Sequence, residues 1–117
     1  MKSIKTIISL FAIALLITIT ITAQDKTEKE IKFKVFGNCN QCVDRIEKAL
    51  KIPEVKYSKW NKKTKILRVI FDSSIEVDSL QKRVAAAGHD TEKFKAPDSV
   101  YASLPKCCLY RESPRTH

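Results

Sequence analysis

The chain has little of what most catalytic sites are built from. Its 117 residues include only two histidines and two glycines, and no glycine-rich loop that would hold a phosphate group. No pair of carboxylates is spaced for acid–base chemistry. There is no internal repeat and no low-complexity tract. We therefore expect a small binding protein that is not an enzyme.

Acidic residues are also in the minority. The chain has 22 Lys and Arg against 13 Asp and Glu, a formal net charge of +9. Such a balance is common in proteins that bind nucleic acid or anionic membranes. Here, however, the lysines are scattered, and none of them forms a basic cluster interleaved with the aromatic side chains on which single strands stack. We expect no nucleic-acid ligand, and interpret the charge as solubility and attraction to an acidic partner.

The first 23 residues, 1–23, have the pattern of a signal peptide. Lys2 and Lys5 precede an apolar run over 7–21, and Ala23 offers a cleavage point. The run is shorter than the ~20 apolar residues of a spanning helix. We expect an exported protein, periplasmic or secreted, that has no membrane contact after cleavage. The alternative is an uncleaved anchor.

A Cys-x-x-Cys pair, Cys39 and Cys42, is the most informative feature of the remaining chain. Alternating apolar residues over 31–35 predict a strand before it, and apolar residues at helical spacing over 43–50 predict a helix after it. We expect the Gly-Asn step at 37–38 to supply positive φ angles at the turn between them. A helix start favours negative charge and lowers the pKa of a thiol there. Two thiolates suit a soft ion such as Cu(I) or Hg(II).

The rest of the pattern predicts an α+β fold. Two strands at 55–60 and 66–71 form a hairpin, rich in aromatic and β-branched residues. A second helix follows at 77–87 and ends at Gly88, a C-terminal cap. A weak strand pattern at 91–95 comes last. The order strand, helix, strand, strand, helix, strand is that of the ferredoxin-like fold.

The stretch around the cysteine pair resembles the metal-binding loop of heavy-metal-associated domains. These domains form copper chaperones, modules of metal-pumping P-type ATPases and periplasmic mercuric-ion-binding proteins. Their pattern is Gly-Met-x-Cys-x-x-Cys, in which Cys39 and Cys42 match the two metal ligands and Phe36-Gly37 replaces Gly-Met. The family's methionine packs beneath the loop, so we expect Phe36 to fill that space. The resemblance covers 30–95 and implies a βαββαβ sandwich, with two helices on one face of an antiparallel sheet.

The same resemblance makes His89 a candidate site residue. It lies just after the second predicted helix, in a loop that the family places beside the metal loop. A histidine there approaches the metal as a third ligand in some members, and a neutral imidazole is a suitable donor. The alternative is a polar loop residue without metal contact.

The segment 96–117 lies outside the family pattern. Its prolines make a long helix unfavourable, and its Tyr and Leu side chains predict that it docks on the domain. Cys107 and Cys108 are adjacent, and adjacent cysteines rarely bond to each other. We therefore expect them either to join Cys39 and Cys42 as metal ligands, or to form disulfides with these cysteines or with a partner protein.

Together these observations predict a signal peptide at 1–23, a polar linker at 24–29, a heavy-metal-associated domain at 30–95 and a cysteine-containing extension at 96–117. The predicted function is to bind a thiophilic ion on an exposed turn and pass it on by ligand exchange. Cu(I) is the first choice, with Hg(II), Zn(II) and Cd(II) as alternatives. The expected partner is a metal donor or acceptor, such as a metal-transporting ATPase or another carrier.

Two other functions fit a Cys-x-x-Cys pair. A thiol–disulfide oxidoreductase also uses the pair at a helix start. Against it, only about 15 residues precede Cys39 in the mature chain, too few for the strand-helix-strand unit of a thioredoxin-type domain. An interaction module held together by disulfides or zinc is the other alternative. Structural zinc usually takes two spaced pairs, and an adjacent pair is awkward to place on one tetrahedron.

Overall fold

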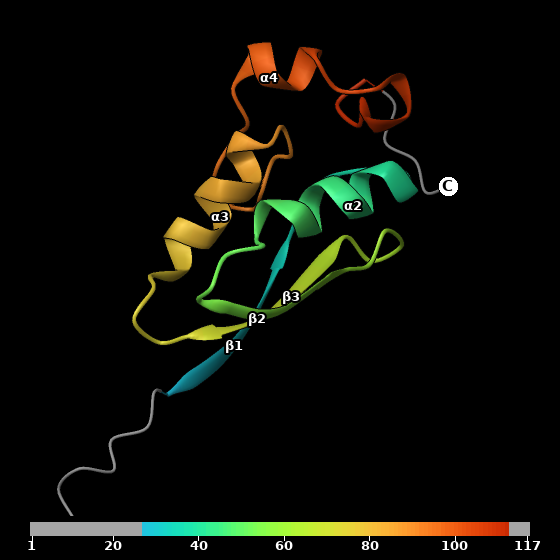
Figure 1. Cartoon of the computed structure of the whole chain (residues 1–117). Coiled ribbons are helices and arrows are strands. Elements are labelled where there is room, and N and C mark those ends of the chain that lie inside the picture. Colours follow the sequence, from blue (N-terminus) through green and yellow to red (C-terminus); the bar gives the residue numbers. More distant parts are fainter. Residues whose placement is uncertain (1–26, 113–117) are drawn as a thin grey trace, which may run out of the picture.

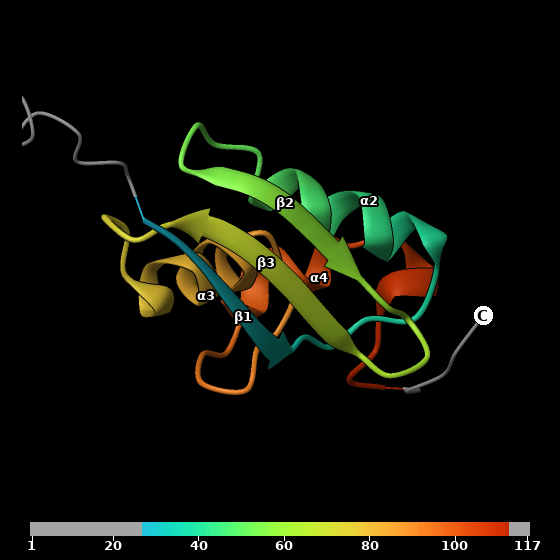
Figure 2. The ribbon, with the colours of Figure 1, turned by 90° about the horizontal axis from the view of Figure 1, so that it is seen from below.

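A computed structural model of the chain describes residues 27–112. The predicted signal peptide and the first part of the linker lie outside these residues. Helices α2 (Asn40–Ala49) and α3 (Val77–Ala86) cover one face of a sheet (Figure 1). In the view from below, no helix of residues 27–112 covers the other face of the sheet (Figure 2).

The sheet has three antiparallel strands in the order β1-β3-β2. β1 spans Glu28–Lys34, β2 spans Val55–Trp60 and β3 spans Ile66–Asp72. Because side chains alternate along a strand, every second residue of the central strand β3 faces the helices. These residues are fully buried: Leu67, Val69 and Phe71. β1 begins inside the range that the sequence assigns to the linker.

The α+β prediction of ferredoxin-like class is confirmed, but the strand predicted at 91–95 is wrong. In its place the structure has a single antiparallel bridge between Val35 and Thr91. The backbone N–H of Thr91 donates to the carbonyl of Phe94 at 2.8 Å, and the N–H of Phe94 donates to the Thr91 hydroxyl at 3.0 Å. Backbone groups that an edge strand would offer to β1 are therefore used inside a tight turn.

Both helices pack through the apolar stripe that the sequence predicts. α2 buries Ile46, and α3 buries Leu80 and Val84 against the sheet. Gly88 follows the end of α3, and its φ of 110° requires a glycine. A Cβ at this position would also lie 2.9 Å from the Leu104 side chain. The cap is therefore also a contact point for the C-terminal segment.

The described part of that segment, residues 96–112, docks on the domain as the sequence predicts. We call it the tail. It contains helix α4 (Asp98–Ala102) and the short 3-10 helix η2 (Lys106–Cys108), and it runs from the end of α3 to the N-terminal end of α2 (Figure 1). Its buried anchors are Tyr101, Leu104, Cys108 and Tyr110.

The part of the chain that the structure describes contains no helix that is both long enough and apolar enough to cross a membrane.

Candidate metal centre

The cysteine pair lies where the sequence places it, at the first turn of α2. Cys39 is the N-cap residue, and the N–H of Cys42 donates to its carbonyl at 3.0 Å. The backbone N–H of Asn38 donates to the Cys42 sulfur at 3.4 Å. The strand-to-helix turn therefore directs a backbone donor at the Cys42 sulfur.

The tail brings the second pair of cysteines to the same point. The sulfur of Cys107 lies 2.7 Å from that of Cys39, and the sulfur of Cys108 lies 2.7 Å from that of Cys42. Further separations are 3.5 Å for Cys39–Cys42, 3.5 Å for Cys39–Cys108 and 3.9 Å for Cys107–Cys108. All four are free thiols. Sulfurs from residues far apart in the sequence thus form one cluster, which we call the four-sulfur cluster.

The spacing of three of these sulfurs, those of Cys39, Cys42 and Cys108, suits one metal ion. Four sulfurs around an ion at about 2.3 Å each form a tetrahedron with edges of about 3.8 Å. Three of the separations already lie between 3.5 and 3.9 Å. The two shorter contacts, Cys39–Cys107 and Cys42–Cys108, would have to lengthen. Cys108 lies within 4.8 Å of both loop sulfurs, whereas Cys107 is not part of that group, so the expectation that an adjacent pair is awkward on one tetrahedron stays a prediction.

The pKa values of the thiols in the cluster are shifted in different directions. Burial acts to raise the pKa of Cys39, but hydrogen bonds from the Cys107 thiol, the backbone of Cys42 and the other two thiols outweigh it and lower the pKa to about 7. The pKa of Cys107 is raised, chiefly because its thiol donates to Cys39. Burial raises the pKa of Cys108, and its contacts with Cys42 and Cys39 add to this effect. Cys39 is the sulfur most ready to act as a thiolate.

The cluster is not on an exposed turn, contrary to the sequence-based expectation. Cys39 is 7% exposed, and Cys42 and Cys108 are fully buried. Cys107 is partly exposed, with its thiol 3.5 Å from the amide oxygen of Gln41. The tail covers the loop, which a pattern ending at residue 95 could not show.

Beneath the loop, Trp60 takes the place expected for Phe36. Trp60 is 2% exposed, and its indole N–H donates to the carbonyl of Val35 at 3.0 Å. A Cβ on Gly37 would lie 2.9 Å from the Trp60 ring and 3.1 Å from Cys42 Cβ. Phe36 instead is 36% exposed and stacks on Tyr110, with ring centroids 6.4 Å apart.

The positive φ angles expected at 37–38 are also wrong. Among the described residues only Lys65 and Gly88 have positive φ. Gly37 is needed for space, since any side chain there would collide with the tryptophan beneath the loop. The close approach of Trp60 to the loop therefore explains why residue 37 is a glycine, and the backbone geometry of the turn does not.

His89 lies beside the loop but not with the sulfurs. Its Nδ1 is 2.8 Å from the carbonyl of Phe36, which only accepts, so Nδ1 carries the proton. Its ring stacks on Tyr110 at 5.5 Å. The potential ligand atoms that lie within 4.8 Å of one another in the described chain are the sulfurs of Cys39, Cys42 and Cys108. A role for His89 as third ligand stays a prediction that this arrangement does not support.

The burial of His89 makes stability depend on pH. Burial lowers its pKa from 6.5 to about 4, with a contribution from Arg45. The unfolded chain therefore binds a proton between these pH values and the folded chain does not, so stability is highest above about pH 6.5 and falls as the pH drops towards 4. The expected loss is about 3 kcal/mol. Urea unfolding of the wild type and of His89→Gln across this range would measure it. Equal pH profiles would contradict this assignment.

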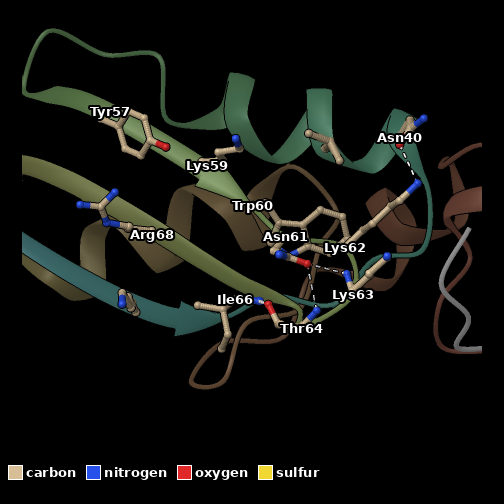
Figure 3. A pocket seen from close by; sticks show the side chains of 12 residues that line it. Asn40, Tyr57, Lys59, Trp60, Asn61, Lys62, Lys63, Thr64, Ile66 and Arg68 are labelled. Carbon is tan, nitrogen blue, oxygen red and sulfur yellow. Dashed lines mark hydrogen bonds between the residues drawn. The ribbon is translucent and has the colours of Figure 1, made fainter.

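A basic groove lies beside the start of α2, apart from the sulfurs. Its volume is about 790 Å³, and it lies along β2, β3 and the hairpin between them (Figure 3). Its lining contains no cysteine and no carboxylate, but five cationic side chains: Lys32, Lys59, Lys62, Lys63 and Arg68. Lys62 reaches the metal loop by donating to the side-chain oxygen of Asn40 at 2.9 Å. Four of the lysines that are scattered along the sequence thus line this groove.

Comparisons with known proteins identify the fold. No protein-family model matches the chain, and no curated protein matches it. Among solved structures, the "CopZ metallochaperone" is 24% identical, a likeness of fold alone; the match covers 54% of this chain and 98% of that one, with a TM-score of 0.52. Oxidized MerP from Ralstonia metallidurans CH34 is 26% identical over 56% of this chain and 96% of that one, with a TM-score of 0.53.

The water-soluble region of the P-type ATPase CopA from Bacillus subtilis is 31% identical, with a TM-score of 0.54. That match covers 58% of this chain and 47% of the other, so this chain spans about half of that structure. The chain therefore has the fold of a heavy-metal-associated domain, with a Cys-x-x-Cys motif at 39 and 42. The resemblance inferred from the sequence is confirmed, and it accounts for little more than half of the chain.

Proposed function

We propose that this protein binds a soft metal ion, most favourably Cu(I), and passes it to another protein. The observation that carries this proposal is the group of free thiols at the start of α2, where Cys39, Cys42 and Cys108 bring their sulfurs within 4.8 Å of one another. Thiolates select thiophilic ions over Mg²⁺ and Ca²⁺. The likeness to CopZ, MerP and CopA supports the same choice.

Metal uptake begins at Cys39 in this proposal. Its lowered pKa, about 7, supplies a thiolate near neutral pH. Each further thiol that binds the ion loses its proton, so binding releases protons and weakens as the pH falls. Transfer follows by ligand exchange: a partner's thiolate binds the ion, and one of the original sulfur ligands leaves and is reprotonated. No electron is transferred in this sequence.

The site of action and the partner are part of the same proposal. The N-terminal pattern of 1–23 supports export, to the periplasm or the medium. The likeness to the soluble region of CopA supports a metal transporter or a related carrier as the partner. The lysines of the basic groove, next to the metal loop, favour an acidic surface on that partner.

The test uses the chain from Gln24 to His117 under reducing conditions. Native mass spectrometry should show Cu(I) bound, and the complex should hold copper against a strong Cu(I) chelator. On mixing with the soluble region of CopA, copper should then move to that protein. A chain that refuses Cu(I) and instead reduces disulfides in a test protein such as insulin would replace the carrier function with the oxidoreductase.

A further inference from the structure

The tail is fixed to the loop after α3 by a specific set of polar contacts, centred on Arg111. Its guanidinium donates to both carboxylate oxygens of Asp90, at 2.7 and 3.0 Å. It also donates to Asp98 at 3.0 Å and to the carbonyl of Ala96 at 2.8 Å. The guanidinium lies over the Tyr101 ring, 4.2 Å from its centroid. Two parallel hydrogen bonds to one carboxylate hold an arginine in a single orientation.

Tyr110 makes a second connection to the same loop. Its hydroxyl donates to the carbonyl of Gly88 at 2.8 Å and accepts the backbone N–H of Asp90 at 2.7 Å. Its ring lies between those of His89 and Phe36, close to both. The loop after α3 thus holds the tail directly after the η2 cysteines, at Tyr110 and Arg111. We call these contacts of Arg111 and Tyr110 the latch.

The latch holds Cys107 and Cys108 against the cysteines of the metal loop. With the tail docked, Cys107 contacts Cys39, Cys108 contacts both Cys42 and Cys39, and the sulfurs of Cys107 and Cys108 are 3.9 Å apart. The loop cysteines are at most 7% exposed in this arrangement. An incoming thiolate therefore finds little open surface at Cys39 and none at Cys42.

We propose that the tail is a lid that completes the metal site, with Cys107 and Cys108 as its third and fourth ligands. This inference rests on the proposed function. With the lid closed, one ion has four sulfur ligands and no open position, and it is stored. With the lid open, the ion keeps the two sulfurs of Cys39 and Cys42, and ligand exchange with a partner becomes possible. Release of the ion is thus governed by the latch.

The number of sulfur ligands tests the closed site. Cd(II) is the probe, because X-ray absorption counts the sulfurs around it. The wild-type chain should show four sulfurs, and Cys107→Ser/Cys108→Ser should show two sulfurs, with lighter atoms completing the shell. The same sulfur number in both proteins would overturn the lid, although the carrier function would stand. Equally tight binding by Cys39→Ser/Cys42→Ser would instead overturn the carrier function.

The rate of release tests the latch without removing any thiol. Arg111→Gln should pass Cu(I) to a chelator about tenfold faster than the wild type, because loss of a partly buried charged pair acts mainly on dissociation. Arg111→Lys should lie between them, since it keeps the charge but not the paired hydrogen bonds. Arg83→Gln, at an exposed arginine of α3, is the matched control and should not change the rate. Equal rates in all four proteins would overturn the latch.

Discussion

Replacing Cys39 and Cys42 together with serine is expected to weaken Cu(I) binding by about a thousandfold or more, which corresponds to about 4 kcal/mol. A hydroxyl is a hard donor that keeps its proton near neutral pH, so the variant loses both thiolates of the loop. The two sulfurs left, on η2, have raised pKa values and lose the contacts that place them. Competition with a graded series of Cu(I) chelators would measure the change.

The tail pair provides the matched control for this experiment. Cys107→Ser/Cys108→Ser removes the same number of thiols but leaves the two cysteines at the start of α2 in place. It should lose clearly less affinity. Circular dichroism of both variants would verify the fold, since serine is close in size to cysteine. Tight Cu(I) binding by a folded Cys39→Ser/Cys42→Ser chain would show that the metal lies elsewhere.

Trp60→Ala is expected to lower the free energy of unfolding by about 3 to 5 kcal/mol. The indole is almost fully buried beneath the metal loop, against Gly37, and donates to the carbonyl of Val35. Alanine leaves a cavity at this position and leaves the carbonyl of Val35 without the indole N–H as its donor. Because a small domain is stabilised by only about 5 to 15 kcal/mol, the variant should be close to unfolding. Urea unfolding followed by circular dichroism gives the value.

Trp60→Phe separates the two contributions. Phenylalanine keeps most of the ring contact but loses the hydrogen bond, so this variant should lose about 1 to 3 kcal/mol, the cost of the unsatisfied acceptor and a smaller cavity. If Trp60→Ala were no less stable than Trp60→Phe, the tryptophan would not support the loop as the structure indicates.

The sequence was sufficient for the elements whose patterns are local. The stripe of α2 and the alternation in β1 and β3 follow from residue periods of 3.6 and 2, and the position of Cys39 at the helix start follows from where the two patterns meet. The prediction of a strand at 91–95 was wrong, because the alternation on which it rested is weak. Thr91 supplies a hydroxyl that closes a turn on Phe94 in place of strand pairing.

The errors at the site have one physical origin, contacts between residues far apart in the chain. The strand pattern at 55–60 does not show that the ring of Trp60 reaches the loop at Gly37. The covering of Cys42 depends on the tail, whose route is set by the ion pair of Arg111 with Asp90. No local sequence pattern predicts this ion pair. The adjacent cysteines were the only signal that the tail concerns the metal loop.

The four-sulfur cluster joins two short segments that lie 68 residues apart at Cys39 and Cys107. An unfolded chain offers the ion only two separate pairs of thiols, whereas the folded chain offers all four together. Whatever affinity the ion gains from this gathering is added to the stability of the fold. Proteases cut opened chains, so the ion slows degradation of the molecule that carries it. Under the proposed function we expect empty molecules to be degraded before loaded ones, so that the lifetime of the protein follows the supply of the ion.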